Sequence, residues 1–439
     1  MDGSSIYSHL EQLILGNVMM RVAIARNLIC LLVVLSSSCI AAENWERFRG
    51  PDGQGKAASN VVMTWDADTN VAWKLDLPGL GSSSPVLHSG KVFVTCYSGE
   101  SGEKAERILV CADAQTGKQL WTHSVPAPAQ EDSYRGFITE HGYASGSAAC
   151  DGKNVYAFFG KAGVIALTMD GELLWHVQVG SMSSNRRWGS GASVVLSDNI
   201  LIVNAAEEAR ALIGLNIADG SEAWKADYDN LELCFATPVL VEGEAGVIEA
   251  VIAMPGETWG LNPKTGKLRW FYETGTGGNV SPSVVVGEEA FYTFGGYPQQ
   301  QTVAIRRGGR KNITESHRLW ETGESSYVAT PLLHDGHLYW VSDRGFAFAM
   351  NAKTGETVTK ARLAGLRSGG RPVYASPILV GDKLVVVTRK SGTLVFAASP
   401  EMKVLHQNPP LDESQFNGTP AVVDGSLYLR SDQAIYCIR

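Results

Sequence analysis

The sequence has few cysteines and no cysteine cluster. The seven cysteines are Cys30, Cys39, Cys96, Cys111, Cys150, Cys234 and Cys437. No two of them are adjacent or form a CxxC pair, and no histidine stands beside them at metal-ligand spacing. These absences exclude a dense disulfide framework and a zinc site of the usual kind. The five cysteines beyond residue 42 are therefore expected to be isolated thiols in buried strands.

The sequence also lacks an excess of positive charge. Its 439 residues carry a formal net charge of −8, and no basic run exceeds the short one around Arg306–Arg307 and Arg310–Lys311. A protein that neutralises nucleic-acid phosphates needs a basic surface, so nucleic acid is not the expected partner. With 44% hydrophobic and 19% charged residues, the composition is that of a globular protein rather than a disordered one.

No hydrophobic run is long enough to cross a membrane as a finished helix. Residues 20–42 contain two arginines, an apolar run from Leu28 to Leu35, and small residues ending at Ala41–Ala42. This order is typical of a secretory signal peptide, so residues 1–42 are expected to be removed from an exported, periplasmic or extracellular protein. The chain then starts at Met1, or at Met19 or Met20. A buried N-terminal helix is the alternative, and a lipid anchor on Cys39 is disfavoured because Ser36 replaces the usual bulky aliphatic residue.

Helical periodicity is missing throughout, and an internal repeat takes its place. Four copies of one phrase are clear: CADAQTGKQLW (111–121), LTMDGELLW (167–175), LNIADGSEAW (215–224) and LNPKTGKLRW (261–270). MNAKTGETVT (350–359) keeps the turn without the tryptophan, and RLW (318–320) keeps the tryptophan after a basic, aberrant turn. The period, in the high forties, indicates a propeller or a solenoid.

A second phrase sets the number of repeats at eight. It is a small-residue step that leads into an apolar strand, and its copies are SSSPV (82–86), ASGSA (144–148), GSGAS (189–193), FATPV (235–239), NVSPS (279–283), VATPL (328–332), YASPI (374–378) and NGTPA (417–421). Each unit is expected to contain four strands: a Gly/Ser-rich inner strand, two apolar strands and an outer strand that carries the tryptophan. The fold class is therefore predicted to be all-β.

The two ends of the chain complement each other. The last unit stops after its third strand, while NVAWKLDL (70–77) is an outer strand without an inner one. We expect this strand to complete the eighth blade, which closes the ring and removes exposed sheet edges. The predicted organisation is a signal peptide (1–42), a lead-in (43–69) and one eight-bladed β-propeller of antiparallel blades (70–439). An eight-unit solenoid, the alternative, would need capping repeats.

From Trp73 to Arg439 the chain resembles the pyrroloquinoline-quinone-like (PQQ-like) β-propeller family. Ala112, Asp113, Thr116, Gly117 and Trp121 carry the match, as do Asn262, Thr265, Gly266 and Trp270, and WERFRGPDGQG (45–55) is similar to a lead-in of secreted members. The turn glycines and tryptophans are interpreted as structural: Gly117, Trp121, Gly171, Trp175, Gly220, Trp224, Gly266 and Trp270. The family includes quinoprotein dehydrogenases, a scaffold of outer-membrane barrel assembly and kinase sensor domains, so the resemblance does not choose a function.

Signatures of catalysis are missing. The resemblance implies that a PQQ enzyme with calcium would need a carboxylate and amide ligand set, an aspartate base and commonly two adjacent cysteines, and these are not found at matched positions. G-x-S-x-G, HExxH and P-loop motifs are absent as well. No cofactor and no metal site are predicted. We expect a non-catalytic, monomeric binding module, with a PQQ-dependent oxidoreductase acting on alcohols or sugars as the alternative.

One part of the repeat, the connection that leads into each inner strand, is a candidate binding site. The connections that lead into the inner strands should converge around the funnel mouth, and they carry aromatic residues and five arginines. The candidate ligand-binding residues are Arg135, His141, Tyr143, Arg186, Arg187, Trp188, Asn279, Tyr327, Arg367, Arg371, Tyr374 and Asn417. Such a rim suits a protein, a peptide or a small anionic ligand. The alternative is that the rings pack between blades and the arginines are only solvated.

Overall fold

The computed structural model describes residues 43–99, 105–243, 246–367 and 370–439. The expected signal peptide, the alternative starts at Met19 and Met20, and Cys39 lie outside the described residues. Within the described ranges, none of the helices has the length and apolar character needed to cross a membrane.

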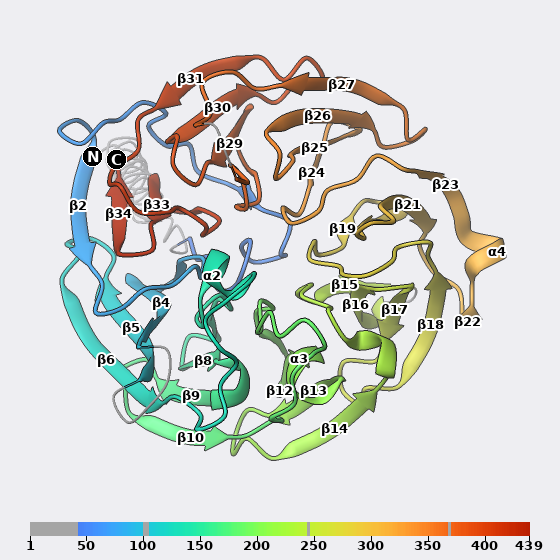
Figure 1. The fold of residues 1–439 in the computed structure, drawn as a ribbon, viewed down its shortest axis with the longest axis horizontal. Coiled ribbons are helices and arrows are strands. Elements are labelled where there is room, and N and C mark those ends of the chain that lie inside the picture. Colours follow the sequence, from blue (N-terminus) through green and yellow to red (C-terminus); the bar gives the residue numbers. More distant parts are fainter. Residues whose placement is uncertain (1–42, 100–104, 244–245, 368–369) are drawn as a thin grey trace, which may run out of the picture. The chain divides into compact units, whose positions relative to one another are not determined.

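Residues 43–439 form one unit in which eight sheets are arranged in a ring (Figure 1). Blades are numbered here along the chain, and strands are given from the axis outwards. Blade 1 has β3 (Val86–His88), β4 (Lys91–Ser98), β5 (Glu106–Asp113) and β6 (Gln119–Pro126). Blade 2 has β7 (Ala149–Cys150), β8 (Asn154–Phe158), β9 (Val164–Thr168) and β10 (Leu173–Val177). Blade 3 has β11 (Val195–Ser197), β12 (Ile200–Ala205), β13 (Ala211–Asn216) and β14 (Glu222–Asp227). Blade 4 has β15 (Val239–Glu242), β16 (Ile248–Met254), β17 (Glu257–Leu261) and β18 (Leu268–Glu273), with β22 (Lys311–Asn312) added outside.

The second half of the ring follows the same plan. Blade 5 has β19 (Val285–Val286), β20 (Ala290–Gly295), β21 (Gln301–Arg306) and β23 (Arg318–Thr322). Blade 6 has β24 (Leu332–His334), β25 (His337–Val341), β26 (Phe346–Asn351) and β27 (Thr357–Arg362). Blade 7 has β28 (Ile378–Val380), β29 (Lys383–Val387), β30 (Thr393–Ala397) and β31 (Val404–Asn408), with β1 (Lys56–Ala57) added inside. Blade 8 has β32 (Ala421–Val423), β33 (Ser426–Arg430), β34 (Ala434–Ile438) and β2 (Val71–Asp76). Helical turns are confined to connections: α2 (Ile138–His141), η1 (Gly160–Ala162), α3 (Ala206–Ala209), η2 (Asp229–Leu231) and α4 (Thr314–His317).

The eight-bladed architecture predicted from the repeat is confirmed, and so is the way the ring closes. β2 pairs antiparallel with β34, with Trp73 opposite Cys437, so both ends of the propeller share blade 8. The innermost strands are two to four residues long and begin after the Gly/Ser-rich step, which was expected to lie within them. The step itself instead makes the contacts between blades that are described below.

The second and third strands of each blade form the core. β4 is buried from Val92 to Tyr97, and all six residues of β12 are buried. Both faces of these strands pack against neighbouring blades, so their sequences are continuous apolar runs rather than alternating ones. The five described cysteines, Cys96, Cys111, Cys150, Cys234 and Cys437, are buried and unpaired.

Five of the repeat tryptophans connect their blade to the next. The indole N–H of Trp73 donates to the Ala114 carbonyl of the next blade's TG turn at 3.1 Å. Trp121, Trp175, Trp224 and Trp320 make the same bond to Met169, Ile217, Pro263 and Ala352. The turn glycine lies against the indole: a Cβ on Gly117, which has φ 72°, would stand 2.5 Å from a Trp73 ring atom. Glycine is therefore needed both for the turn and for the close approach.

Trp270 departs from this pattern because the next blade has no TG turn. The basic segment 306–317 replaces it, and β22 from this segment pairs with β18. The Trp270 indole N–H donates instead to Glu249 Oε2 of its own blade at 2.9 Å. Arg269 and Arg310 lie 3.2 Å and 3.6 Å from the other oxygen of that carboxylate. The aberrant turn thus supplies one of the groups that neutralise a buried glutamate.

A ring of hydroxyl groups, the hydroxyl girdle, holds the inner ends of the blades together. Its members are Ser84, Ser147, Ser193, Thr237, Ser283, Thr330, Ser376 and Thr419. Each link is a backbone N–H that donates to the hydroxyl of the next blade at 2.9–3.0 Å, from Ser84 to Ser147, Ser147 to Ser193, Ser193 to Thr237, Ser283 to Thr330, Thr330 to Ser376, Ser376 to Thr419 and Thr419 to Ser84. At seven of the eight junctions this bond fixes the position of a blade relative to its neighbour. Among the described residues no such bond joins Thr237 to Ser283, whose hydroxyl has no partner. Ser283 follows the proline of its phrase, whereas the girdle residues of the other proline-containing phrases precede it.

The lead-in lies across the axis and binds the inner edges of the blades. Trp45 pairs with Leu87 of blade 1, and the Glu46 carbonyl accepts from the Cys150 N–H of blade 2. On the opposite side, the Gln54 side chain accepts from Val286, and β1 pairs in parallel with β28. Innermost strands have unpaired backbone groups on the axial side, and the lead-in supplies their partners.

Arg49 is the centre of this segment. Its side chain is 0% exposed, and the guanidinium donates only to backbone carbonyls. The acceptors are Gly53 (3.2 Å), Gln54 (2.9 Å), Thr330 (3.0 Å), Pro331 (3.1 Å) and Pro377 (3.2 Å). Burial lowers the pKa of Arg49 to about 9. One side chain thus ties the lead-in to blades 6 and 7.

Candidate functional site

The connections between blades surround one end of the axis, the mouth, and a cavity of about 180 Å³ lies beneath it. Phe48 of the lead-in contributes to the lining, and so do girdle hydroxyls such as Ser193 and Thr330. The remaining lining residues include Phe137, His141, Trp188, Phe235, Asn279, Tyr327, Tyr374 and Asn417. Six of the twelve candidate residues from the sequence therefore meet in one cavity, because each lies in a connection that leads into an inner strand.

Aromatic and arginine side chains form a continuous chain across the mouth, which we name the mouth belt. Its members are Tyr297, Tyr327, Arg371, Phe137, Trp188 and Phe235. The Arg371 guanidinium lies 4.6 Å from the Tyr327 ring centroid and 5.0 Å from that of Phe137. The Phe137 and Trp188 rings are 4.4 Å apart, and at the ends Tyr297 contacts Tyr327 and Phe235 contacts Trp188. Six different connections thus contribute to one surface.

The short helix α2 lies near the axis in Figure 1. Residues from three other connections form hydrogen bonds or an ion pair with it. Arg389 Nη1 is 2.6 Å from the Glu140 carboxylate, and Arg389 Nε donates to Asn417 at 2.9 Å. The Asn417 amide in turn donates to the Glu140 carbonyl at 3.0 Å. His141 bonds to Ser145 through Nδ1 at 2.6 Å and to the Trp188 carbonyl through Nε2 at 2.9 Å. Burial lowers the pKa of His141.

The candidates chosen from the sequence did not include three residues that lie at the mouth: Arg389, Asp343 and Tyr297. A blade reaches the mouth by two kinds of connection: from an outer strand to the next inner strand, and from the second strand to the third. The candidate residues came only from the first kind, whereas these three come from the second, between β29 and β30, β25 and β26, and β20 and β21. Reading the residues after each second strand as a set would have found them.

The five arginines of the candidate site differ in environment. Arg371 pairs with Asp343 at 3.0 Å, and Arg367 pairs with Glu413 at 3.5 Å on an exposed surface. Arg135, Arg186 and Arg187 are exposed, and among the described residues they form no ion pair; Arg186 stands 6.0 Å from the Trp188 ring. Of these five, Arg371 makes the closest contacts with rings that line the cavity, at 4.6 Å and 5.0 Å.

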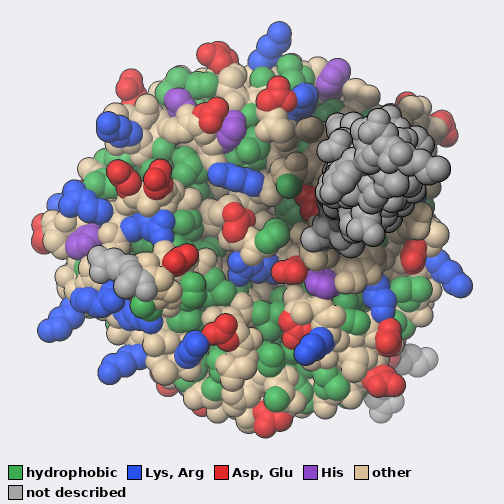
Figure 2. All heavy atoms as spheres, turned by 180° about the vertical axis from the view of Figure 1, so that it is seen from behind, with side chains coloured by type: hydrophobic (Ala, Val, Ile, Leu, Met, Phe, Trp, Pro, Cys, Tyr) green, Lys and Arg blue, Asp and Glu red, His purple; other side chains and the backbone are tan. Residues whose placement is uncertain are grey.

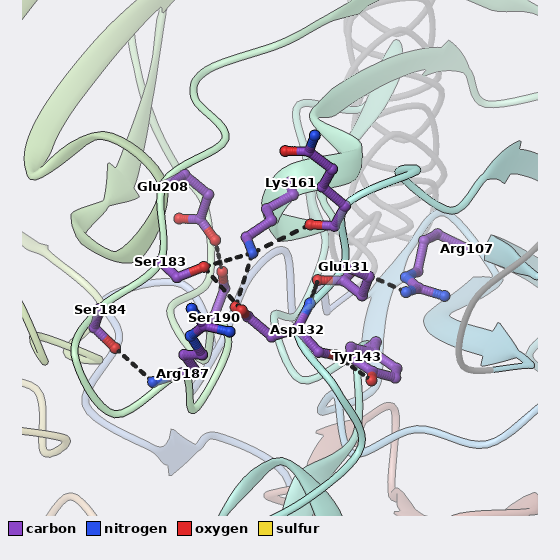
Figure 3. Close-up of polar contacts among 11 residues, drawn as sticks. Arg107, Glu131, Asp132, Tyr143, Lys161, Ser183, Ser184, Arg187, Ser190 and Glu208 are labelled. Carbon is purple, nitrogen blue, oxygen red and sulfur yellow. Dashed lines mark hydrogen bonds and ion pairs between the residues drawn. The ribbon is translucent and has the colours of Figure 1, made fainter.

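Tyr143 is not among the described residues that line the cavity, and belongs to a separate polar cluster (Figure 3) whose members come from blades 1, 2 and 3 and from the connections between them. Its hydroxyl donates to the Asp132 carbonyl at 2.6 Å, and the Arg107 guanidinium lies 4.5 Å from its ring centroid. Arg107 pairs with Glu131, and Lys161 pairs with Asp132, each at 2.8 Å and with side chains at most 8% exposed. Both cations are thus neutralised, and this cluster supports the packing of the blades beneath the mouth.

Two glutamates on α3 lie buried at the same junction. Burial raises the pKa of Glu207 to about 7 and that of Glu208 to about 8. Glu207 accepts from the Leu233 N–H at 3.0 Å, and Glu208 is bonded by Ser190, while one oxygen of each carboxyl has no partner among the described residues. The protonated forms are therefore favoured in the folded state near neutral pH.

Because the pKa values of Glu207 and Glu208 are raised in the folded state, we expect the free energy of unfolding to fall as the pH rises from about 5 to 8.5. Between the ordinary carboxyl pKa and the raised folded values, the folded state binds more protons than the unfolded state, so raising the pH favours unfolding. Glu208→Gln should flatten the profile and raise the melting temperature at pH 8.5 by roughly 2–4 °C. Scanning calorimetry across this pH range measures the melting temperatures of both proteins. Glu222→Gln on the exposed strand β14 is the control. An identical pH profile for Glu208→Gln and the wild type would contradict the prediction.

The residues of the cavity do not fit a quinone cofactor held by a metal ion. No carboxylate lines the cavity. In the ranges that the structure describes, no group of three or more His, Cys, Asp or Glu side chains is placed to hold a metal. Pyrroloquinoline quinone carries three carboxylates, for which this lining offers neither a metal nor an unpaired cation. We derive no reaction step through it.

The opposite face of the ring shows no single charged surface. In the part of Figure 2 that is not grey, basic and acidic side chains alternate, with a gathering of basic ones on one side. The mouth is therefore the better candidate site, because it combines a cavity with a contiguous aromatic surface.

Eight blades joined by TG turns and tryptophans, and closed by the N-terminal strand, define a PQQ-like β-propeller. The family model described as outer membrane protein assembly factor BamB matches residues 57–142 and 108–361. The chain belongs to this family.

Individual relatives agree with that assignment. The outer membrane protein assembly factor BamB of Burkholderia pseudomallei is 21% identical over 402 residues, which cover 83% of this chain and 95% of that protein. The crystal structure of BamB from Moraxella catarrhalis superposes with a TM-score of 0.60 at 15% identity, covering 84% of this chain and 96% of the other. A quinohemoprotein alcohol dehydrogenase from Comamonas testosteroni reaches 0.62 at 11% identity, covering 90% and 80%. At these identities the structural likeness shows the fold alone.

Proposed function

We propose that the protein is an exported, non-catalytic scaffold of outer-membrane protein assembly that docks a protein partner on its mouth. The observation that carries the proposal is the mouth belt. Trp, Tyr and Arg are the residue types that dominate protein–protein binding energy, and here they form one surface around a concave centre. The names of the relatives, which are assembly factors of the outer membrane, support the biological setting and a periplasmic location.

The charge around the belt favours an acidic partner surface. Arg135, Arg186 and Arg187 are exposed and carry no ion pair among the described residues, although the whole chain has a net charge of −8. Exposed charges of this kind steer association and are screened by salt over roughly 10 Å at 0.1 M ionic strength. The affinity for the partner should therefore fall as salt is added.

Site-specific photo-crosslinking in the bacterial envelope tests the proposal. A photoreactive residue at Tyr297, which is 49% exposed, should cross-link a component of outer-membrane protein assembly. Trp188→Ala should reduce the cross-link strongly, with an affinity loss of about 30-fold for a hot-spot residue. Phe271→Ala on β18, at the outer edge of the ring, is the matched control and should leave the yield unchanged. Equal cross-linking in the Trp188 and Phe271 variants would overturn the proposal.

A second experiment addresses the enzymatic alternative. Purified protein is mixed with pyrroloquinoline quinone and calcium, and dye-coupled oxidation of alcohols and sugars is followed. We expect no turnover above that of the free cofactor. Stoichiometric cofactor binding with turnover would replace the scaffold proposal by an oxidoreductase.

A further inference from the structure

The axial cavity is uncharged. Among the described residues, no Asp, Glu, Lys or Arg side chain lines it, and its one histidine, His141, has its pKa lowered by burial. Two arginines within 5 Å of lining rings are already neutralised, Arg371 by Asp343 at 3.0 Å and Arg389 by Glu140 at 2.6 Å, and Arg186, 6.0 Å from the Trp188 ring, is exposed to solvent. An ionised ligand would lose its hydration without gaining a free counter-charge. The cavity therefore selects a neutral group.

Its walls and size suit one aromatic ring. Six rings line it: Phe48, Phe137, Trp188, Phe235, Tyr327 and Tyr374. Its volume of about 180 Å³ slightly exceeds the ~150 Å³ of an engineered apolar cavity that binds benzene. Rings of this kind contact one another edge to face or offset-stacked, and such contacts add binding energy beyond the buried area.

One wall residue has an unused hydrogen-bonding group. The Tyr374 hydroxyl is buried and has no partner among the described residues, although the Tyr374 ring is held in place by the Arg389 guanidinium 4.5 Å from its centroid. A buried, unsatisfied hydroxyl destabilises the free protein. A ligand with a polar atom on its ring would remove that cost.

We propose that the axial cavity is a receptor for an uncharged aromatic ring that carries one hydrogen-bonding group, such as a phenol or an indole. The ring enters between the belt residues and stacks among the aromatic walls, and a small displacement of Tyr374 brings its hydroxyl, which is enclosed in the free protein, to the polar atom of the ligand. Its source is either a free small molecule or a Tyr or Trp side chain of a polypeptide. The inference does not depend on the proposed scaffold function, because it rests on the lining of the cavity alone.

Ligand-observed NMR with small probes measures the binding. p-Cresol and indole should bind with Kd below about 1 mM. Benzoate and tyramine, which are charged at neutral pH, should bind at least about tenfold more weakly because the lining offers no free counter-charge. The blocked amides of Tyr and Trp identify the source: binding at least equal to that of the free rings points to a polypeptide side chain, and weaker binding points to a small molecule. Failure of both p-cresol and indole to bind at about 5 mM would overturn the inference.

Gly191 offers a way to fill the cavity. It lines the cavity without a positive φ, and a Cβ there would stand 3.6 Å from the Cβ of Phe235, an ordinary contact. Gly191→Leu should weaken p-cresol binding at least about tenfold, because the added side chain occupies the space of the ring. Gly323→Leu is the matched control, since a Cβ at Gly323 meets nothing within 4 Å. If Gly191→Leu does not fold, Gly191→Ala replaces it, and unchanged binding in a folded Gly191 variant would contradict the inference.

Tyr374→Phe separates the hydrogen bond from the shape of the cavity. This variant should weaken p-cresol about three- to tenfold while leaving toluene binding unchanged, because toluene has no polar atom to lose. Equal losses for the two probes would mean that Tyr374 acts only through packing, and the assignment of its hydroxyl would be wrong. Cross-linking at Tyr297 tests the scaffold function independently, so either proposal can fail without the other.

Discussion

Replacing Arg49 by methionine is expected to lower the free energy of unfolding by about 4 kcal/mol or more. Methionine fills much of the same space but donates no hydrogen bond. The buried carbonyls of Thr330, Pro331 and Pro377 would lose their guanidinium partner, and each unsatisfied group costs about 1–3 kcal/mol. The lead-in should then leave the axial channel before the ring unfolds, because β1 contributes only two paired residues to blade 7.

Thermal unfolding and limited trypsin digestion measure these two effects. The Arg49→Met variant should melt at a lower temperature and become sensitive to cleavage at Arg47 and Lys56. Arg49→Lys should not rescue it, since an ammonium cannot span carbonyls of two blades as a planar guanidinium does. Arg135→Met, which removes an exposed arginine, is the control. A melting temperature and digestion pattern like those of the wild type would show that the lead-in is held by other contacts.

Replacing Trp270 by alanine is expected to cost roughly 3–5 kcal/mol of stability, the range for a fully buried aromatic side chain. Trp270 is 0% exposed and stacks on Phe291 with ring centroids 5.6 Å apart. Its loss also leaves Glu249, which is 5% exposed, without its indole donor. The substitution therefore destabilises the protein in two ways: it leaves a cavity, and it removes one hydrogen-bond donor from the Glu249 carboxylate.

Trp121→Ala provides the comparison within the same repeat. Trp121 is half-buried, and its indole bonds to a turn carbonyl that water can reach after the substitution. We expect a smaller loss than for Trp270→Ala when both variants are unfolded in urea. A Trp121 variant as unstable as the Trp270 variant would mean that the segment 306–317 adds nothing to the stability of blade 4.

Part of the candidate site could be predicted from the sequence. Trp188, Tyr327, Tyr374 and Asn417 lie in the same kind of connection, the one that leads into an inner strand, and a ring places equivalent connections at similar distances from its axis. Tyr143 lies in such a connection too, yet it packs against Arg107. Arg389 and Asp343 lie on hairpins inside blades, so nothing in the phrase that marks the blade connections pointed to them. Whether these residues bind a partner or a ligand stays a prediction.

By itself, the sequence determined the number of blades, the turns and the closure of the ring. These features depend on local chemistry that recurs along the chain: a hydroxyl residue in each of the eight small-residue phrases, a tryptophan in six outer strands, and a glycine where the turn beneath the indole needs positive φ. Only the tertiary structure decided what lies on the axis. The lead-in around Arg49 has no repeat to identify its partners, since the carbonyls it binds become neighbours only when distant blades close into a ring. The uncharged cavity depends on the same closure, because it exists where connections from different blades meet over Phe48.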